Sequence, residues 1–156
     1  MVMDARLLLH TLAIAVLGLM CGSELNVGLF AHPLFRNQPL AIHVPMRAGF
    51  AALFGRVMPF WMSGSTLLNL LLLFPFVRLS DSAWRLAAVA FAIQVVCVVF
   101  SLLAPVPINK GIARWTPETL PADWRVQEER WDSYHAVRTF ALIVAFVLLI
   151  FSLAGF

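Results

Sequence analysis

Long apolar runs separated by short polar stretches dominate the pattern of this chain. Each run is close to the roughly 20 residues that a helix needs to cross a hydrocarbon core about 30 Å thick. The pattern predicts four helices, over about residues 5–31, 46–77, 82–103 and 122–155. It therefore indicates an all-α protein, an up-down bundle of four helices that is integral to a membrane.

The second and fourth predicted helices are longer than the membrane requires, and their extra turns are polar. The second would extend about 45 Å at a rise of about 1.5 Å per residue, so its first turns, with Arg47 and Arg56, reach the membrane interface. The fourth begins with DWRVQEERWDSYHAVR (residues 123–138) and continues as an apolar tail. Both polar starts are expected at the same end of the bundle, because consecutive helices run in opposite directions and the second and fourth therefore run in the same one.

Prolines mark the expected ends of helices. Pro33 is predicted to end the first helix, so that residues 32–45, HPLFRNQPLAIHVP, form a polar connection. Further along, Thr116, Pro117 and Glu118 have the pattern of a cap, a first-turn proline and a first-turn acid. They predict a short helix across the membrane surface.

Composition supports a membrane protein and excludes several other classes. Hydrophobic residues make up 62% of the 156 residues and charged residues 12%, against roughly 45–50% and about 25% in soluble domains. The net charge of +3 is spread along the chain, so nucleic acid is not an expected partner. The two cysteines lie inside apolar runs and form no CxxC pair. We expect one transmembrane domain over residues 1–156, with the lipid bilayer as its surroundings and oligomerisation left open.

Polar chemistry is concentrated at one end of the predicted bundle. On a helix, Trp131, His135 and Arg138 share a face, and the end of the first helix brings Glu24, an acid at membrane depth that needs a partner. The polar end collects Glu24, His32, His43, Arg47, Arg56, Asn109, Lys110, Trp131, Tyr134, His135 and Arg138. All basic residues except Arg6, Arg78 and Arg85 lie toward it, which favours a cytoplasmic location for this end.

Three chemistries fit this set of side chains. His135 could act as a general base, with Glu24 or Glu128 as the orienting acid and arginine as the charge stabiliser. Alternatively, Glu24, His32 and His135 could bind a single transition metal, provided that the chain bends near Gly28. Haem would require one or two axial histidine ligands, for which His135 and His32 are candidates.

Plainer interpretations exist for the individual residues. His135 could be an interfacial histidine satisfied by a carboxylate, and Trp131 an anchor at the membrane interface. Tyr134 and Arg138 at adjoining positions favour a ligand-binding cavity instead. The predicted substrate contacts are Asn109, Tyr134, Arg47, Arg56 and Trp61.

The chain resembles the anthrone oxygenase-like family of small four-helix membrane proteins. The residues that carry the resemblance are Asn109 in PINK, the WxxxHxxR pattern of Trp131, His135 and Arg138, and AHPLF at the end of the first helix. The Tyr-x-x-Gly-His-like element of fungal members is absent here, where residues 56–62 read RVMPFWM.

The resemblance implies an enzyme that oxidises polyketide anthrones to anthraquinones with O₂ and without a conventional cofactor. It implies His135 as base, Trp131 as a stacking or electron-transfer residue, and Asn109 with Arg138 as polar positioners. We therefore expect an oxygenase-like redox enzyme for a hydrophobic aromatic substrate that enters from the bilayer, and no cofactor. The alternatives are a non-catalytic membrane module that binds haem, quinone or another lipid-soluble ligand, or a subunit that docks a partner protein.

Overall fold

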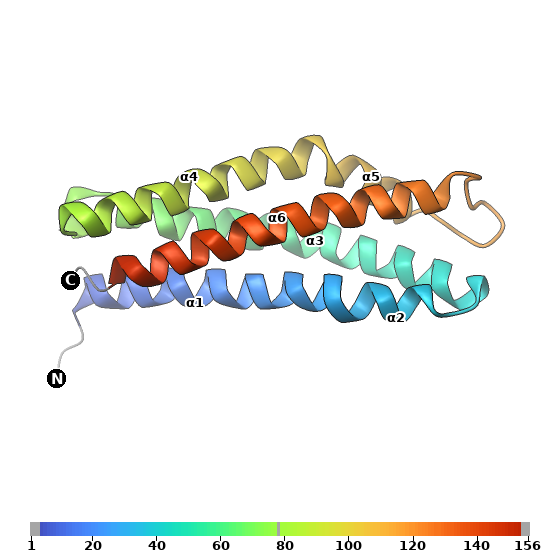
Figure 1. Ribbon diagram of the computed structural model, residues 1–156, viewed down its shortest axis with the longest axis horizontal. Helices are drawn as coiled ribbons and strands as arrows, with labels where there is room; N and C mark the ends of the chain where they lie inside the picture. The colour runs from blue at the N-terminus through green and yellow to red at the C-terminus, as the bar shows by residue number, and fades with distance from the viewer. Residues whose placement is uncertain (1–3, 78, 154–156) are drawn as a thin grey trace.

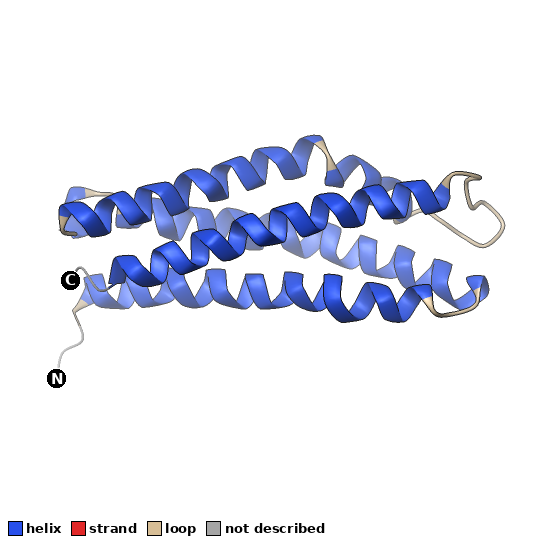
Figure 2. Cartoon of the chain, viewed as in Figure 1, coloured by secondary structure: helices blue, strands red, loops and turns tan. Residues whose placement is uncertain are grey.

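The computed structural model describes residues 4–77 and 79–153, and within these ranges all regular secondary structure is helical (Figure 2). The four longest helices are α1 (Ala5–Asn26), α3 (Leu40–Leu72), α4 (Asp81–Leu103) and α6 (Trp124–Leu153). The shorter elements are the π-helical η1 (Val27–Ala31), α2 (His32–Arg36), the 3₁₀ turn η2 (Pro75–Val77) and α5 (Pro105–Ile112).

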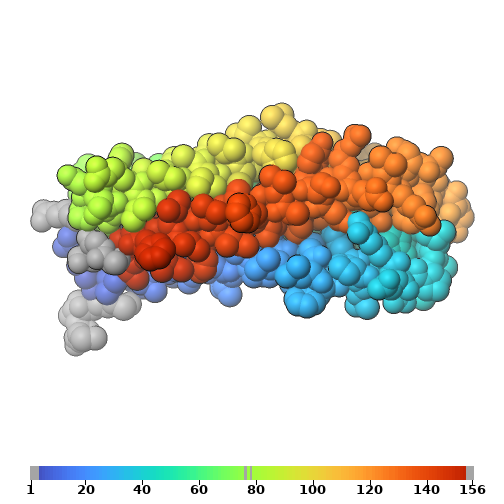
Figure 3. Space-filling view, viewed as in Figure 1, coloured from blue at the N-terminus to red at the C-terminus, as the bar shows by residue number. Residues whose placement is uncertain are grey.

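The long helices lie side by side along the molecule (Figure 1). Helix α6 packs against both α1 and α4, and α3 packs against the same two helices. The space-filling view shows α4 and α6 adjacent over much of one face, with α1 on the other side of α6 (Figure 3). The elements α2, α5 and the start of α6 lie at one end of the molecule, which we call the polar end (Figure 1).

By length and composition, three helical segments of the described chain could cross a membrane: Ala5–Arg36, Asp81–Leu103 and Trp124–Leu153. This is consistent with an integral membrane protein. Helix α3 is not among the three, and it carries Arg47, Arg56 and two internal prolines. The predicted fourth span therefore remains a prediction.

The first helix does not end at Pro33, and the predicted connection over residues 32–45 is mostly helical. Proline lacks an N–H and crowds the carbonyl four residues earlier. The π-helical turn η1 lies directly before it, and its last bond runs from the His32 N–H to the Val27 carbonyl, five residues back. This wider turn accommodates the proline, so the chain stays helical to Arg36. Helix α3 begins at Leu40, six residues before the predicted start at 46, and contains Pro45. It ends at Leu72 and not at the predicted 77, because the chain turns there and continues as η2.

The short surface helix predicted near Thr116 is also absent from the described residues. Residues 116–119 instead form a turn in which the Thr116 and Thr119 hydroxyl groups accept each other's backbone N–H at 3.2 Å. The extra helix of this connection is α5, which begins at Pro105. Helix α4 runs from 81 to 103, against the predicted 82–103, and α6 begins at Trp124, against the predicted 122. The predicted end of the last helix, at 155, lies outside the described residues.

Candidate functional site

The polar end of the molecule buries an unusual number of ionisable side chains. They come from α1, α2, α3 and α6, which are far apart in sequence. The buried ionisable residues at this end are Glu24, His32, His43, Arg47, Glu128, His135 and Arg138. Buried charges require partners, and the structure provides them in two connected networks.

The first network is centred on Glu24, near the end of α1. Its Oε2 lies 2.5 Å from Arg138 Nη2 and 3.0 Å from His135 Nδ1. Its backbone carbonyl lies 3.0 Å from His135 Nε2. Arg138 also donates from Nη1 to the Ser101 hydroxyl on α4, at 3.2 Å. Three helices are thereby joined at one buried carboxylate.

The contacts of His135 constrain where its protons lie. A carbonyl oxygen can only accept, so Nε2 carries a hydrogen and donates it to the Glu24 carbonyl. The contact between Nδ1 and Glu24 Oε2 then needs a further proton on one of the two atoms. When that proton is absent, Arg138 Nη2, at 3.4 Å from Nδ1 and 2.5 Å from Oε2, can donate to either acceptor. We call this unit the Glu24–His135 pair, since the two groups hold one exchangeable proton between them.

The second network is centred on Asp132, one turn before His135 on α6. Asp132 Oδ1 accepts from His32 Nδ1 at 2.9 Å and from Arg47 Nη2 at 3.1 Å, while Oδ2 accepts from Arg36. Arg47 also donates from Nη1 to His32 Nε2, which assigns the single hydrogen of His32 to Nδ1. His32 is therefore held as a neutral imidazole between an arginine and a carboxylate.

Arg47 extends this second network deeper into the polar end. Its Nε lies 3.1 Å from Glu128 Oε1, which also lies 2.9 Å from His43 Nε2. The other ring nitrogen of His43 donates to the Phe35 carbonyl at 2.9 Å. The start of α3 is thus tied to both α2 and α6 by buried polar contacts.

Trp131 connects the two networks through its ring. It stacks on His135 with ring centroids 4.8 Å apart and an interplanar angle of 12°. The Arg47 guanidinium carbon lies 4.8 Å from the Trp131 ring centroid, a cation–π contact. The indole consequently fixes the plane of the His135 imidazole.

A cavity of about 360 Å³ lies beside these groups, and we call it the first cavity. One part of its wall is polar and is formed by Glu24, His32, Arg47, Asn109, Lys110, Trp131, His135 and Arg138. The remainder is largely apolar and includes Phe50, Phe54, Met58, Met62, Val98, Leu102 and Val106. Such a volume, with a few converging polar groups on an apolar wall, is typical of a small-molecule site.

A second cavity, of about 420 Å³, lies between the end of the first helix and α6. It shares Glu24, His32 and His135 with the first cavity. Its other lining residues include Gly28, Leu29, Arg36, Asp132, Ala136, Thr139 and Phe140. The Glu24–His135 pair therefore forms part of the wall of both cavities.

The predicted site residues divide into two groups in the structure. Glu24, Trp131, His135, Arg138, Asn109 and Arg47 all line the first cavity. Tyr134 lies outside the lining of both cavities and contacts Phe100 edge-on, and Arg56 is exposed. Trp61 also lies outside both linings and donates from Nε1 to the Val16 carbonyl at 3.2 Å.

Sequence reasoning missed Asp132, Ser101 and the aromatic wall formed by Phe50 and Phe54. Asp132 had a usable signal, because it lies three residues before His135 and four after Glu128, and such spacings bring helical side chains close. The other residues had no signal, since an apolar or serine position in a long apolar helix is compatible with any role.

The residues proposed for a metal site do not form one. No three histidine, cysteine, aspartate or glutamate side chains in residues 4–77 and 79–153 are placed to hold a metal ion. Both nitrogens of His32 and both of His135 are already engaged, and Arg47 donates directly to His32. The donor set of Glu24, His32 and His135 therefore does not fit a metal in this arrangement.

Comparison with known proteins agrees with the resemblance seen in the sequence. A family described as anthrone oxygenase matches residues 50–148, well over half of the chain. This segment contains Asn109, Trp131, His135 and Arg138, whereas Glu24 precedes it. No curated protein and no solved structure matches the chain. The chain belongs to the anthrone oxygenase family, which indicates an oxygenase-like function at the level of the family.

Proposed function

We propose that the protein is a membrane-embedded oxygenase that oxidises a hydrophobic, anthrone-like aromatic substrate with O₂, assisted by the Glu24–His135 pair as base. The observation that carries this proposal is the first cavity, which joins an apolar wall to a buried acid, imidazole and guanidinium. Its volume of about 360 Å³ falls within the usual range of ligand sites, roughly 300–1,000 Å³.

The proposal includes a membrane arrangement. Helices α1, α3, α4 and α6 would form a four-helix up-down bundle, with α3 as the fourth span. Large apolar side chains face outward on several helices, among them Phe60, Leu103 and Phe151, and lipid is the natural surrounding for them. A hydrophobic substrate would reach the first cavity from the bilayer, and the polar end would face the cytoplasm.

The chemistry balances without an external reductant. Conversion of a CH₂ group to a carbonyl by one O₂ gives one water, so carbon loses the four electrons that O₂ gains. The pair takes a proton from the acidic CH₂ group, which leaves a carbanion that is delocalised as an enolate and reacts with O₂. Arg138 and Arg47 line the same cavity and would stabilise the enolate oxygen.

The base does not need a free imidazole nitrogen in the resting structure. In the proton-free state, Arg138 Nη2 lies within reach of both Nδ1 and Oε2 and can donate to either. The proton taken from the substrate can then be held between Nδ1 and Oε2, which already lie 3.0 Å apart. Proton transfer would thus neutralise the repulsion between two acceptors, which favours it energetically.

The test is turnover by the purified protein in lipid nanodiscs. A hydroxylated anthrone is supplied, and O₂ uptake and anthraquinone formation are measured together, with protein-free autoxidation subtracted. We expect one O₂ consumed per anthraquinone, with ¹⁸O from ¹⁸O₂ in the new carbonyl. His135→Ala should lower kcat/KM by about 100-fold or more, the usual range for loss of a general base. Val137→Ala, an exposed position on the same helix, is the matched control.

Two results would overturn the proposal. One is binding of the anthrone without turnover above autoxidation, which supports a non-catalytic module for a lipid-soluble ligand. The other is equal activity of His135→Ala and the wild-type protein. A Soret band in the purified protein would support the haem-binding alternative.

A further inference from the structure

The Glu24–His135 pair must exchange its proton with the surroundings after each turnover, and the first cavity is a poor route for this. The first cavity is the proposed substrate site, and an aromatic substrate bound there would cover the side of the pair that lines it. Water is then excluded from this side. Repeated turnover therefore needs a path to solvent from another side of the pair.

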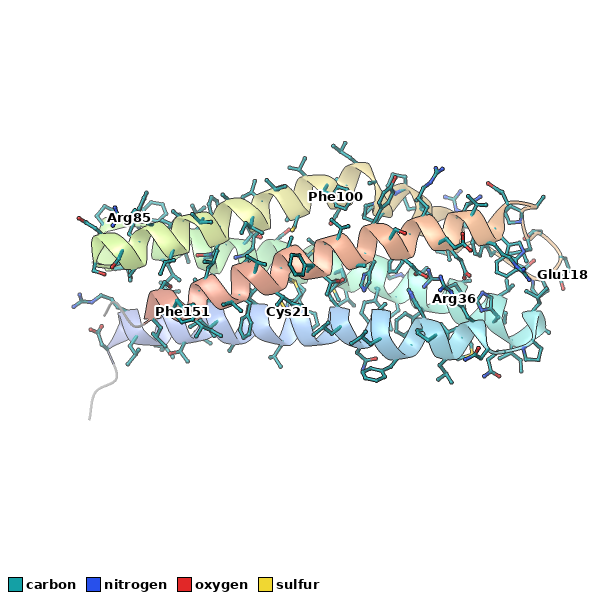
Figure 4. The ribbon with its side chains drawn as sticks, viewed as in Figure 1. Cys21, Arg36, Arg85, Phe100, Glu118 and Phe151 are labelled. Carbon is teal, nitrogen blue, oxygen red and sulfur yellow. The ribbon has the colours of Figure 1, made fainter. Side chains whose placement is uncertain are left out.

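The second cavity provides a path of this kind. Its wall includes both Glu24 and His135, and it also includes Asp132 and Arg36. The side chain of Asp132 is 23% exposed and that of Arg36 45%, whereas those of Glu24 and His135 are 1% and 4% exposed. Arg36 lies toward the polar end of the molecule (Figure 4). The cavity thus lies between a buried proton-holding pair and a carboxylate that reaches the surface.

The second cavity is open to its surroundings. Gly28, Leu29, Arg36 and Ala136 in its wall are all exposed. Near Arg36 and Asp132 the wall is polar, and ordered water is expected where such groups converge. The volume of about 420 Å³ leaves room for several waters.

The backbone around the cavity keeps the pair accessible. Gly28 belongs to the π-helical turn η1 and lines the second cavity. A Cβ atom at Gly28 would lie 3.5 Å from both Cδ2 and Nε2 of His135. Any larger side chain would extend over the imidazole from this side. Glycine in this wide turn therefore leaves the ring facing the cavity.

We propose that the second cavity is the proton-exchange route of the Glu24–His135 pair, with Asp132 as the carboxylate at its outer end. This inference rests on the proposed function, because it assigns how the base of that reaction is reset. The proton moves from the pair through water in the cavity to Asp132 and then to solvent. His32 and Arg36 hold Asp132 in place and are not themselves carriers.

The first test measures proton exchange without any substrate. Protein labelled with ¹⁵N-histidine is transferred to D₂O, and loss of the His135 ring N–H signal is followed by NMR, with the ring signal of His10 as a reference buried elsewhere. Ala136→Phe places bulk in the second cavity, and Val137→Phe adds the same bulk to an exposed neighbour that lines neither cavity. We expect exchange at His135 to slow at least fivefold in Ala136→Phe and to be unchanged in Val137→Phe.

The second test removes the outer carboxylate. Asp132→Asn keeps the shape of the side chain, and Asp123→Asn is the control at an exposed position near the start of α6. In the anthrone assay, Asp132→Asn should lower kcat about tenfold with KM within twofold, and formic acid, a small weak acid, should restore kcat in a saturable way. The two control variants, Val137→Phe and Asp123→Asn, should retain wild-type kcat.

The outcomes separate the route from the proposed function. Unchanged His135 exchange in both Ala136→Phe and Asp132→Asn overturns the route. A raised KM for O₂ in Ala136→Phe with unchanged exchange also overturns it and assigns the cavity to gas access. Because the exchange measurement needs no substrate, wild-type protein that exchanges as expected but does not convert an anthrone overturns only the proposed function.

Discussion

Glu24 holds both ring nitrogens of His135: its carboxylate lies 3.0 Å from Nδ1, and its backbone carbonyl lies 3.0 Å from Nε2. A single residue thus fixes the orientation of the imidazole and the position of its Nε2 hydrogen. Trp131 completes this arrangement by stacking on the same ring. The consequences can be tested by single substitutions.

Glu24→Gln should affect both stability and activity. The substitution keeps the size of the side chain but leaves the Arg138 guanidinium buried without its counter-charge. Loss of one partner of a buried pair typically costs about 3–5 kcal/mol, so thermal denaturation in detergent should show a clearly lower Tm. Turnover should fall by about 100-fold or more because the amide lacks the negative charge that helps His135 to hold the proton.

The exposed Glu129→Gln on α6 is the matched control and should leave both Tm and turnover unchanged. Adding Arg138→Met to Glu24→Gln should recover part of the lost Tm, since the unpaired charge is then removed. A Tm for Glu24→Gln equal to that of the wild type would contradict the buried pair.

Substitutions of Trp131 should separate stacking from volume. Trp131→Phe keeps an aromatic face against His135, whereas Trp131→Leu removes the stack and the cation–π contact with Arg47. We expect turnover to fall at least tenfold in Trp131→Leu and by a smaller factor in Trp131→Phe. Equal losses in the two variants would show that the stack does not orient the imidazole.

The apolar wall of the first cavity should set ligand size. Met58→Trp adds bulk to that wall, and Val57→Trp adds the same bulk to the neighbouring exposed position. A hydroxylated anthrone titrated against each variant, with binding followed by fluorescence, should show a Kd at least tenfold higher for Met58→Trp only. Wild-type affinity in Met58→Trp would place the ligand elsewhere.

The two arginines that contact Asp132 should differ in their importance for stability. Arg47 is buried and contacts His32, Glu128 and Asp132, whereas the Arg36 side chain is 45% exposed. Loss of an exposed ion pair typically costs less than about 1 kcal/mol, so Arg36→Ala should barely change the free energy of unfolding. Arg47→Ala should cost several-fold more, and equal costs measured by denaturant titration would contradict the buried network.

The sequence predicted the helical class, the family to which the chain belongs, and four spans, three of which correspond to segments that could cross a membrane. These features depend on local information: apolar runs of sufficient length, and the short pattern of Trp131, His135 and Arg138 on one helix. It also predicted that Glu24 would need buried partners, because a carboxyl group in an apolar run has few alternatives.

Local rules were insufficient at the turn before Pro33 and at the site itself. A proline predicts the end of a helix, but the π-helical turn η1 accommodated it and carried His32 onward into the polar end. Tyr134 and His135 are adjacent on α6, yet of the two residues His135 alone lines the two cavities described above, because neighbouring helical positions face about 100° apart. Which face is buried depends on where α1, α3 and α4 pack. The residue types of the site were therefore readable from the sequence, whereas their pairing and the two cavities that meet at Glu24 and His135 arose only from tertiary packing.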